Sequence, residues 1–596
     1  MTSHRPPRFF NRFLVAPNLL RITFLNTRLQ YPYAHMKVIR SSFLTLAMCC
    51  GIFNIAQSEN KQGQIGIRPP KLVVLISIDQ YRADYATRFA PYYLPARDHA
   101  QLGGFRFLEE TGAWYKDAHH NHVPTATGPG HATLMTGSEP MIDGIIGNEW
   151  LDRYTRKPVY CVSDETVQTV GGKSKPMSPK NLKVTTVGDE LKMATNGKSK
   201  VVGISFKDRA SILMAGHAAD AVIWFDVATG NWVTSTFYAP SGKLPSWVSA
   251  LNDRQIPSMA DGKSWEPLLP SAAYQLTRLA PAEKPDPSGK VFSHAMAKSQ
   301  KTTKQAFDGF TKSGFGQDFL FESVNAALDA EKLGQHDVPD ILVINLATND
   351  YVGHQFGPNS PEVMDISVRT DRLLSALFNR INKTLPGGID EAAIVVTADH
   401  GVLPVPEEMD RTYHISAGRL LAPDVKSAIS GYLRAKYGPG DWILGDGLYE
   451  QNFYLNQDTI AAKNLDPALI EQEAATAAGK VPGVFLAFTR TQLMTNQVPG
   501  WDWVKLALNG FNPSLGGDLM VFEAPGTLAS AGTGTGHSSA WSYDTHVPIL
   551  LRARGVRPGV YTERVHTSDI APTLAMLLGI EAPSGSVGYI LPGSSK

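Results

Sequence analysis

The chain has 596 residues, of which 43% are hydrophobic and 19% are charged, a composition typical of a globular protein with a substantial core. Its 56 basic and 55 acidic residues give a formal net charge of +1 at pH 7. This composition excludes a largely disordered chain. The charge balance favours neither nucleic acid nor an anionic membrane surface, so we expect neither as a partner. Any selectivity for anions must come from a local site.

The N-terminal segment predicts export. Residues 1–36 are interpreted as a mis-assigned upstream start or an extended basic region, with Met36 as the favoured start of the protein. Residues 37–57 have a basic start, a short apolar run and a small-residue exit, the layout of a secretory signal peptide. The apolar run is too short to span a membrane comfortably. We therefore expect a periplasmic or secreted protein without stable membrane insertion, and Cys49 after Leu46-Ala47-Met48 leaves a lipoprotein anchor as the alternative.

One main domain is predicted to follow the leader. Residues 58–70 form a polar linker, and the domain spans residues 71–596. Once the signal is removed only Cys161 remains, so an exported chain has no internal disulfide and depends on core packing or bound metal. We interpret Cys161 as a free, structural cysteine.

Several continuous apolar runs predict buried parallel strands, and polar or charged residues follow each of them. In open α/β sheets, ligands bind beyond the carboxyl ends of the strands, so these side chains are expected to converge. The runs are residues 71–78, followed by Asp79; 341–346, followed by Asp350; 393–398, followed by Asp399 and His400; and 200–205, followed by Lys207 and Arg209.

Helical patterns alternate with the strands, for example at residues 361–382 and 570–578, and Gly579 is placed to end the second helix. The predicted fold is therefore α/β, with a mostly parallel central sheet flanked by helices. Two long regions punctuated by Pro and Gly, about 210–340 and 402–528, are predicted insertions over the active edge of the sheet. The tryptophans of the first region are expected to form a small core of its own, namely Trp224, Trp232, Trp247 and Trp265.

Residues 122–137 hold a candidate anion site. Thr125 and Thr127 lie just ahead of Gly128-Pro129-Gly130 and a run that can form a helix. The free N–H groups and the dipole of a helix N-terminus favour negative charge, so one hydroxyl could act there as a nucleophile or contact phosphate. Threonine is also an ordinary helix cap, so this stretch alone does not decide between the two interpretations.

A set of carboxylates and histidines suggests a metal site. Asp350 and His354 are four residues apart, so both can reach one ion from a turn or first helical turn. With three histidines, the ligand types suit zinc better than manganese or magnesium. Each residue has an ordinary explanation when taken alone, but together at strand ends they favour a metal centre. The full set is Asp79, Asp350, His354, Asp399, His400 and His537.

These motifs resemble those of the alkaline phosphatase superfamily and, within it, the phosphate-irrepressible, PafA-type alkaline phosphatases. The resemblance spans nearly all of the mature chain, with the motifs in the order of that family. They are Ile78-Asp79-Gln80-Tyr81-Arg82, Val123-Pro124-Thr125-Ala126-Thr127 with Gly130-His131, Gly147-Asn148-Glu149-Trp150, Cys161 to Val167, Lys207-Asp208-Arg209-Ala210, Asp350 with His354, Asp399-His400-Gly401 and Tyr543 to Pro548.

The resemblance implies a site with two zinc ions. One ion is expected on Asp350, His354 and His537. The other is expected on Asp79, Asp399, His400 and the oxygen of Thr127, which matches the nucleophile of the family. Asn148, Lys207 and Arg209 match its contacts to phosphate oxygens, whereas Thr125 is read as structural. One departure is Ser538, where the family often has glycine after the last histidine ligand, so His546 is the competing candidate for His537.

The activity implied is hydrolysis of phosphate monoesters through a phosphothreonine intermediate. Three carboxylates and a Thr127 alkoxide cancel the charge of two zinc ions, so Lys207 and Arg209 leave a positive pocket that suits a dianion. The nearest alternative is a nucleotide pyrophosphatase or phosphodiesterase of the same superfamily. A sulfatase is disfavoured because that branch needs a Cys or Ser in place of Thr127. A non-catalytic zinc-dependent binding protein is the alternative from another class, and the protein is expected to be a monomer.

Overall fold

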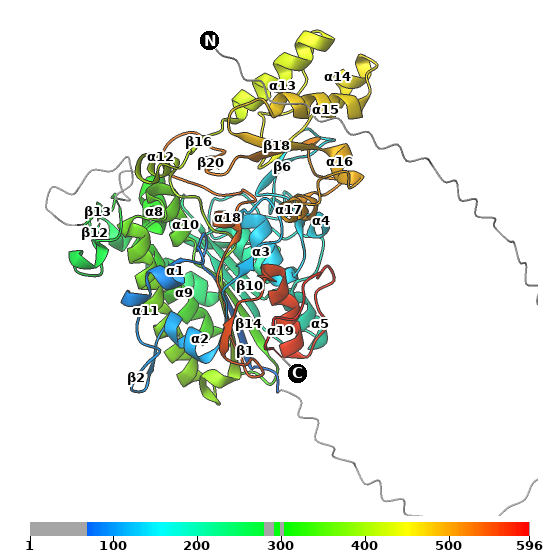
Figure 1. Ribbon diagram of the computed structural model, residues 1–596. Helices are drawn as coiled ribbons and strands as arrows, with labels where there is room; N and C mark the ends of the chain where they lie inside the picture. Colours follow the sequence, from blue (N-terminus) through cyan, green and yellow to red (C-terminus); the bar gives the residue numbers. More distant parts are fainter. Residues whose placement is uncertain (1–67, 279–290, 299–302, 595–596) are drawn as a thin grey trace, which may run out of the picture. The chain divides into compact units, whose positions relative to one another are not determined.

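A ten-stranded sheet lies at the centre of the fold (Figure 1). The five strands from β15 to β10 are mutually parallel, and only β21 and β11 run against the others. This arrangement confirms the predicted α/β fold with a mostly parallel sheet. In spatial order the strands are β22 (Gly559–Tyr561), β4 (Ala113–Tyr115), β21 (Ile549–Arg552), β15 (Ala392–Thr397), β1 (Leu72–Ser77), β14 (Asp340–Asn345), β9 (Val201–Ser205), β10 (Ala221–Asp226), β11 (Asn231–Ser235) and β8 (Thr169–Val170).

The computed structural model describes residues 68–278, 291–298 and 303–594. The predicted signal peptide, the upstream segment and most of the linker lie outside the described residues. No helix within these ranges is both long and apolar enough to cross a membrane.

The central strands end at the same level of the sheet. Ser77, the last residue of β1, pairs with Asn345 at the end of β14 and with Thr397 at the end of β15. Asn345 in turn pairs with Ser205, the last residue of β9. The segments that follow these four strands therefore start side by side at one edge, as expected for a ligand site in a parallel sheet.

Helices cover both faces of the sheet because the strand residues alternate between two hydrophobic clusters. In β1, Leu72, Val74 and Ile76 belong to one cluster and Val73 and Leu75 to the other. The first cluster includes apolar residues of α2 (Phe105–Thr111), α9 (Gly314–Ala330) and α11 (Pro361–Thr384). The second includes those of α3 (Thr127–Thr136), α5 (Val187–Ala194), α6 (Asp208–Ala215) and α19 (Ile570–Leu578), which Gly579 ends in a left-handed conformation.

The region 210–340 is only in part an insertion. Strands β10 and β11 within it extend the central sheet, because β10 pairs in parallel with β9 and β11 pairs with β10. The prediction that its tryptophans form a separate small core is therefore wrong. Trp224 packs in the cluster on one face, and the other three pack in the cluster on the opposite face, namely Trp232, Trp247 and Trp265.

The region 402–528 has a small sheet and a hydrophobic cluster of its own. The sheet has the order β17 (Asn452–Phe453), β19 (Leu519–Glu523) and β18 (Val484–Thr489). Apolar residues from three helices of the region pack on it, among them Ile429, Ile460 and Ile470. The helices of the region are α12 (Pro406–Tyr413), α13 (Ala422–Tyr437), α14 (Gln457–Ala462), α15 (Pro467–Ala478), α16 (Arg490–Met494) and α17 (Asp502–Gly510).

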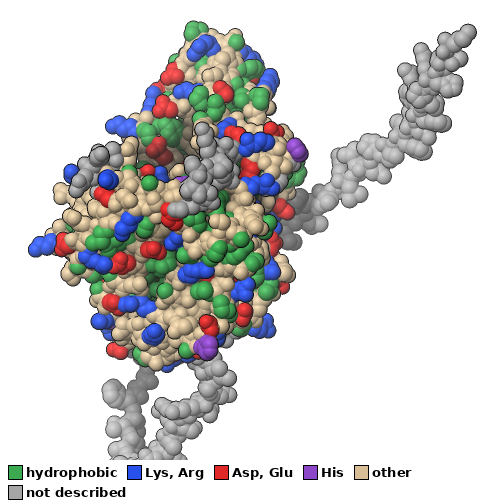
Figure 2. Space-filling model, turned by 90° about the vertical axis from the view of Figure 1, so that its left-hand side faces the viewer, with side chains coloured by type: hydrophobic (Ala, Val, Ile, Leu, Met, Phe, Trp, Pro, Cys, Tyr) green, Lys and Arg blue, Asp and Glu red, His purple; other side chains and the backbone are tan. Residues whose placement is uncertain are grey.

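Charged side chains of both signs are distributed over the surface. On the face shown in Figure 2, Lys and Arg side chains are interspersed with Asp and Glu side chains. This mixture agrees with the formal net charge of +1. Any positive charge that attracts an anionic ligand must therefore be concentrated at a local site.

Candidate active site

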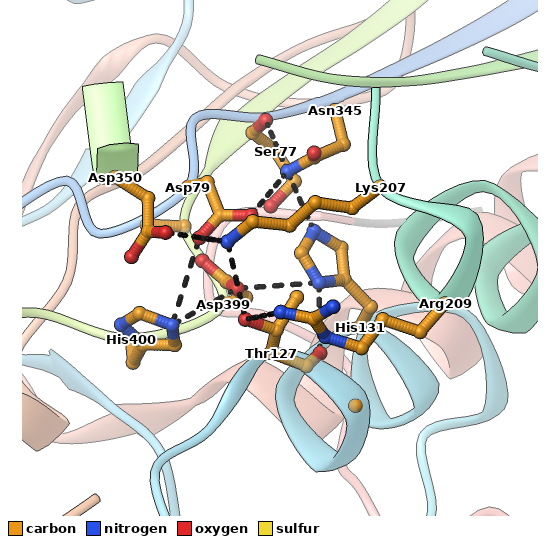
Figure 3. Close-up of polar contacts among 12 residues, drawn as sticks. Ser77, Asp79, Thr127, His131, Lys207, Arg209, Asn345, Asp350, Asp399 and His400 are labelled. Carbon is orange, nitrogen blue, oxygen red and sulfur yellow. Dashed lines mark hydrogen bonds and ion pairs between the residues drawn. The ribbon is translucent and has the colours of Figure 1, made fainter. Parts of the chain in front are cut away.

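The segments that follow β1, β14 and β15 bring Asp79, Asp350, Asp399 and His400 together (Figure 3). Asp79 follows β1, and Asp399 and His400 follow β15. Asp350 and His354 lie on α10 (Thr348–Phe356), which begins three residues after β14. His537 comes from the loop between β20 (Thr527–Leu528) and α18 (Ser542–Thr545). The expectation that these side chains converge agrees with the structure.

Thr127 is the first residue of α3, so its hydroxyl lies at a helix N-terminus. Two cationic side chains converge on it from the segment after β9. Lys207 Nζ lies 3.4 Å and Arg209 Nη2 lies 3.3 Å from Thr127 Oγ1. Thr125 instead donates its hydroxyl to the backbone oxygen of Ser539 at 2.8 Å, a contact that joins two segments of the chain.

The ammonium group of Lys207 also bridges two carboxylates. Its Nζ lies 2.9 Å from Asp79 Oδ1 and 2.6 Å from Asp350 Oδ2. Burial alone would lower the pKa of Lys207, but the charges of Asp350 and Asp79 outweigh it and hold this pKa above its ordinary value. This raised pKa favours a positively charged Lys207 beside Thr127.

Two glycines of α3 lie in close contact with neighbouring segments of the chain. The backbone N–H of Gly128 donates to Asn148 Oδ1 at 2.8 Å, which leaves Nδ2 of Asn148 as the donor of that amide. A Cβ on Gly130 would lie only 2.2 Å from the backbone oxygen of Asp399. Gly130 thus lets α3 pack directly on the segment that carries Asp399 and His400.

Replacing Gly130 by alanine tests this packing. We expect Gly130→Ala to lower the free energy of unfolding by about 1–3 kcal/mol, the usual cost of forcing atoms into a packed core. Gly431, in the exposed part of α13, has open space around its added Cβ. Gly431→Ala should instead raise stability by roughly 0.5–1 kcal/mol, because alanine is the better helix former. Urea unfolding of both variants measures the difference, and equal effects would contradict the packing argument.

Asp350 lies at the centre of one group of metal-ligating atoms. Its Oδ1 is 3.1 Å from His354 Nε2 and 3.7 Å from His537 Nε2. The other ring nitrogens contact main-chain oxygens, since His354 Nδ1 lies 2.8 Å from Thr535 O and His537 Nδ1 lies 2.8 Å from Thr125 O. A histidine whose Nδ1–H donates to a carbonyl presents the lone pair of Nε2 to a ligand.

His400 lies beside Asp399 and Asp79, and its ligand atom also lies within 4.8 Å of those of Asp350 and His537. Its Nε2 is 3.2 Å from Asp399 Oδ2 and 3.6 Å from Asp79 Oδ1. Its Nδ1 lies 2.9 Å from the backbone oxygen of Gly401, so here too Nε2 is the atom left to accept. His400 Nε2 and Asp399 Oδ2 are buried without a hydrogen-bond partner. Buried polar atoms of this kind are expected where a bound group completes the site.

The donor set has the chemistry and spacing of a metal site. Bonds to zinc of about 2.1 Å in tetrahedral geometry place the ligand atoms roughly 3.4 Å apart. The two distances from Asp350 Oδ1 and the two from His400 Nε2 given above fall between 3.1 and 3.7 Å. The rings of His400 and His537 are stacked with centroids 3.5 Å apart, so the side chains around Asp350 and those around His400 adjoin. Three carboxylates and three imidazoles are also the ligand types that zinc accepts.

The pKa directions of Asp350, His400 and His537 suit metal ligation, whereas those of His354 and Asp399 do not. Burial lowers the pKa of both His400 and His537 well below the ordinary value, so both imidazoles are neutral. Burial would raise the pKa of Asp350, but the charges of His354 and Lys207 outweigh it and hold this pKa well below its usual range. A neutral imidazole and an ionised carboxylate are the forms that bind a metal. Burial would lower the pKa of His354, but the charge of Asp350 outweighs it and raises this pKa, and burial beside Asp79 raises the pKa of Asp399 well above its ordinary value.

Two other histidines are placed differently. His131 adjoins Asp79 and Asp399, but its Nδ1 lies 2.8 Å from Thr127 O and its Nε2 lies 2.9 Å from Asn345 Nδ2. Both ring nitrogens are therefore engaged, and His131 is suited to hold the start of α3 rather than an ion.

His546, the competing candidate for His537, belongs to another group of side chains. It lies with Asp117 and His119, and its Nε2 is 2.7 Å from the backbone oxygen of Lys116. Of the two histidines, the structure places His537 beside Asp350.

The sequence interpretation did not assign two residues that orient the carboxylates. Gln80, with a φ of 63°, donates its backbone N–H to Asp399 Oδ1 at 3.1 Å and its side-chain Nε2 to Asp350 Oδ1 at 2.8 Å. Asn345 Nδ2 donates to Asp79 Oδ2 at 3.1 Å. Gln80 lies three residues after the end of β1, and Asn345 is the last residue of β14. These positions could have indicated a role in the site, because polar residues at the ends of buried strands face the ligand edge.

Tyr160 is a third residue that the sequence interpretation did not assign, and it positions the guanidinium of Arg209. Its hydroxyl donates to Asp208 Oδ1 at 2.5 Å and accepts from Arg209 Nη1 at 3.1 Å. Cys161 beside it is free and fully buried, and burial raises the pKa of its thiol. That agrees with a structural cysteine, since only a thiolate is reactive.

Comparisons with known proteins agree with this architecture. Residues 73–436 match the family described as Type I phosphodiesterase / nucleotide pyrophosphatase. The chain is 35% identical to alkaline phosphatase PafA of Elizabethkingia meningoseptica over 90% of this chain and 97% of that protein. It is also 35% identical to alkaline phosphatase PhoV of Synechococcus elongatus, over 93% of this chain and 99% of that one.

The crystal structure of wild-type PafA has the same fold. It superposes with a TM-score of 0.78 at 34% identity and covers 89% of this chain and 99% of that chain. Together with the sheet and the carboxylate–histidine site at its edge, this defines a protein of the alkaline phosphatase superfamily. Within the superfamily, the chain belongs to the PafA-type alkaline phosphatases.

Proposed function

We propose that the protein is an exported, zinc-dependent alkaline phosphatase that hydrolyses phosphate monoesters and releases inorganic phosphate. The observation that carries the proposal is the convergence of Lys207 and Arg209 on the hydroxyl of Thr127, next to Asp79 and Asp350. The relatives named alkaline phosphatases support the same class of phosphoric monoester hydrolase. The protein acts as a monomer in this proposal.

The reaction passes through phosphate bound to Thr127. Thr127 Oγ1 gives its proton to solvent and forms a bond to phosphorus while the bond from phosphorus to the ester oxygen breaks, and the alcohol leaves with a proton taken from solvent. The oxygen of a water molecule then bonds to phosphorus while the bond between Oγ1 and phosphorus breaks. Oγ1 takes up a proton, which restores the hydroxyl, and phosphate is released. Two zinc ions, held by Asp350, His354 and His537 and by Asp79, Asp399 and His400, would lower the pKa of the hydroxyl and stabilise the negative charge of the reacting oxygens.

The cations of the site select a dianion. Lys207 and Arg209 are oriented by Asp79, Asp350 and Tyr160, so their donors are fixed before the ester binds. Asn148 adds the N–H groups of its side-chain amide. Fixed donors stabilise the charge that spreads over the outer oxygens of the phosphoryl group in the transition state. A diester carries one negative charge less and gains less from this arrangement.

Phosphodiesterase activity is the second candidate, since the matched family carries that name. Turnover of 4-nitrophenyl phosphate and of bis(4-nitrophenyl) phosphate distinguishes the two. We expect a clear preference for the monoester, and a clear preference for the diester would contradict the proposal. Export is tested separately: in the secreted protein, the mature N-terminus should lie shortly after the predicted signal peptide at residues 37–57, as determined by mass spectrometry.

Removal of the metal should abolish activity and lower thermal stability together. A ligand that binds only the folded state stabilises it by mass action, so the zinc-free protein is expected to unfold at a lower temperature. Treatment with a chelator, followed by metal analysis, calorimetry and turnover of 4-nitrophenyl phosphate, measures all three quantities. Zinc should restore both turnover and melting temperature at about two ions per chain, whereas full activity without bound metal would refute the cofactor assignment.

A further inference from the structure

Ser538 and Glu450 are two non-glycine residues with positive φ that meet at the active site. The φ angle is 101° at Ser538 and 50° at Glu450. At positive φ the Cβ atom is crowded by the backbone, so these conformations favour glycine or asparagine. Ser538 directly follows His537. A residue kept in such a conformation has to be held by its surroundings.

Glu450 and Gln451 are the central residues of a tight hairpin turn in the region 402–528. The backbones of Tyr449 and Asn452 on either side exchange two N–H to O hydrogen bonds, each of 2.9 Å. Two-residue hairpin turns need positive φ at the first central position, where glycine and asparagine are the usual residues. A glutamate at this position is unfavourable for the turn itself, so its side chain is expected to make stabilising contacts elsewhere.

The carboxylate of Glu450 contacts two segments of the site. Its Oε1 accepts from the backbone N–H of Asn148 at 3.2 Å, and its Oε2 accepts from Ser538 Oγ at 3.1 Å. Gln451 Nε2 donates to the backbone oxygen of Ser538 at 2.6 Å. A Cβ on Gly147 would lie 2.8 Å from Glu450 Cγ, so the segment before Asn148 packs closely on this side chain.

We propose that Glu450 is a positioning residue that fixes the Asn148 segment and the His537 loop relative to one another. This inference rests on the proposed function, which assigns Asn148 to phosphate and His537 to zinc. The side chains of Ser538 and Glu450, the two residues with positive φ, are hydrogen-bonded to each other. The bond to Glu450 holds Ser538 in its unfavourable conformation and thereby keeps His537 beside Asp350. The region 402–528 thus takes part in the site through a turn that binds neither phosphate nor metal.

A double-mutant cycle on the zinc-loaded full chain tests this role, with zinc release to a chromogenic chelator as the readout. We expect Glu450→Ala to release zinc about tenfold to a hundredfold faster than the unchanged protein, the range seen when partners of metal ligands are removed. Ser538→Gly should release zinc at the original rate, because glycine adopts this φ without help. In the Ser538→Gly background, Glu450→Ala should then add little.

The same variants separate the two contacts of Glu450. Glu450→Ala should raise KM for 4-nitrophenyl phosphate in either background, because the Asn148 segment loses its support. Glu450→Gln keeps an acceptor and a donor and should stay close to the unchanged protein. Glu471→Ala is the matched control, since Glu471 is a buried glutamate of the same region whose Oε2 accepts from Thr491 N at 2.9 Å. It should lower stability without changing zinc release or KM.

Two results would overturn the inference: zinc release from Glu450→Ala at the original rate, or rapid release from the double variant. Failure of the proposed function gives a different result, in which the unchanged protein binds no zinc or hydrolyses no phosphate monoester. In that case, hydrogen exchange in the zinc-free chain tests the positioning role of Glu450 separately. Faster exchange at residues 536–540 in Glu450→Ala, reversed by Glu450→Gln, supports the positioning role, and unchanged exchange refutes it.

Discussion

Thr127→Ala is expected to lower the turnover of 4-nitrophenyl phosphate by at least ~10⁴-fold, the scale of loss when a nucleophile is removed. The zinc content should stay near that of the unchanged protein, because three carboxylates and three imidazoles remain. The loss follows from the place of Thr127 Oγ1 at the start of α3, within 3.4 Å of Lys207 Nζ. Steady-state kinetics with metal analysis of the same samples measures both quantities.

Thr125→Ala provides the matched control. Thr125 is equally buried and two residues away, but its hydroxyl is bonded to Ser539 O rather than to the cations of the site. Its loss should cost about 1 kcal/mol of stability, as for an ordinary buried hydrogen bond, and little turnover. Mass spectrometry of acid-quenched reactions should find phosphate on Thr127. Unimpaired turnover in Thr127→Ala would instead remove the nucleophile assignment, whereas a zinc-loaded unchanged protein without turnover would favour a non-catalytic binding protein.

The double variant Lys207→Ala with Arg209→Ala is expected to lose monoester activity by about 10²–10³-fold or more, since one fixed donor to a developing anion contributes on this scale. Diester activity should fall much less, because a diester carries one negative charge less. Comparing kcat/KM for 4-nitrophenyl phosphate and bis(4-nitrophenyl) phosphate gives the ratio directly.

Two further measurements make this result interpretable. Lys192→Ala removes a lysine that binds Asp220 and main-chain oxygens away from the site, so it should leave the ratio of the two activities unchanged. Zinc content has to be measured in the double variant, because Lys207 also lies between Asp79 and Asp350. Equal losses for monoester and diester at full zinc content would indicate that the pair supports only the local structure.

The central sheet and the convergence of its acidic residues could be predicted because both are local properties of the sequence. A buried parallel strand is a continuous apolar run, and the residue that follows it lies at the ligand edge. Asp79 and Asp399 could therefore be predicted as site residues because each directly follows an apolar run. The strand β10 was missed because residues 221–226 follow the short helix α6 inside a region punctuated by Pro and Gly, where such a run was taken for part of an insertion.

The groups that support the site were harder to predict because their partners are distant in the sequence. Glu450 and Asn148 are separated by 302 positions, and no spacing pattern connects a hairpin turn with a loop so far away. Gln80 was within reach, since it follows Asp79, but its contacts to Asp399 and Asp350 depend on its left-handed backbone conformation. The departure at Ser538 was visible in the sequence, whereas its compensation by Glu450 required the structure.

The three histidines proposed as zinc ligands share a property that bears on how such a site evolves. Each contacts a main-chain oxygen through Nδ1, at Thr535, Thr125 and Gly401. A point substitution at these positions removes no ligand-orienting atom, but it can disturb the backbone that carries the oxygen: a Cβ on Gly401 would lie 2.3 Å from the backbone oxygen of Tyr543. What selection has to preserve is the path of three loops.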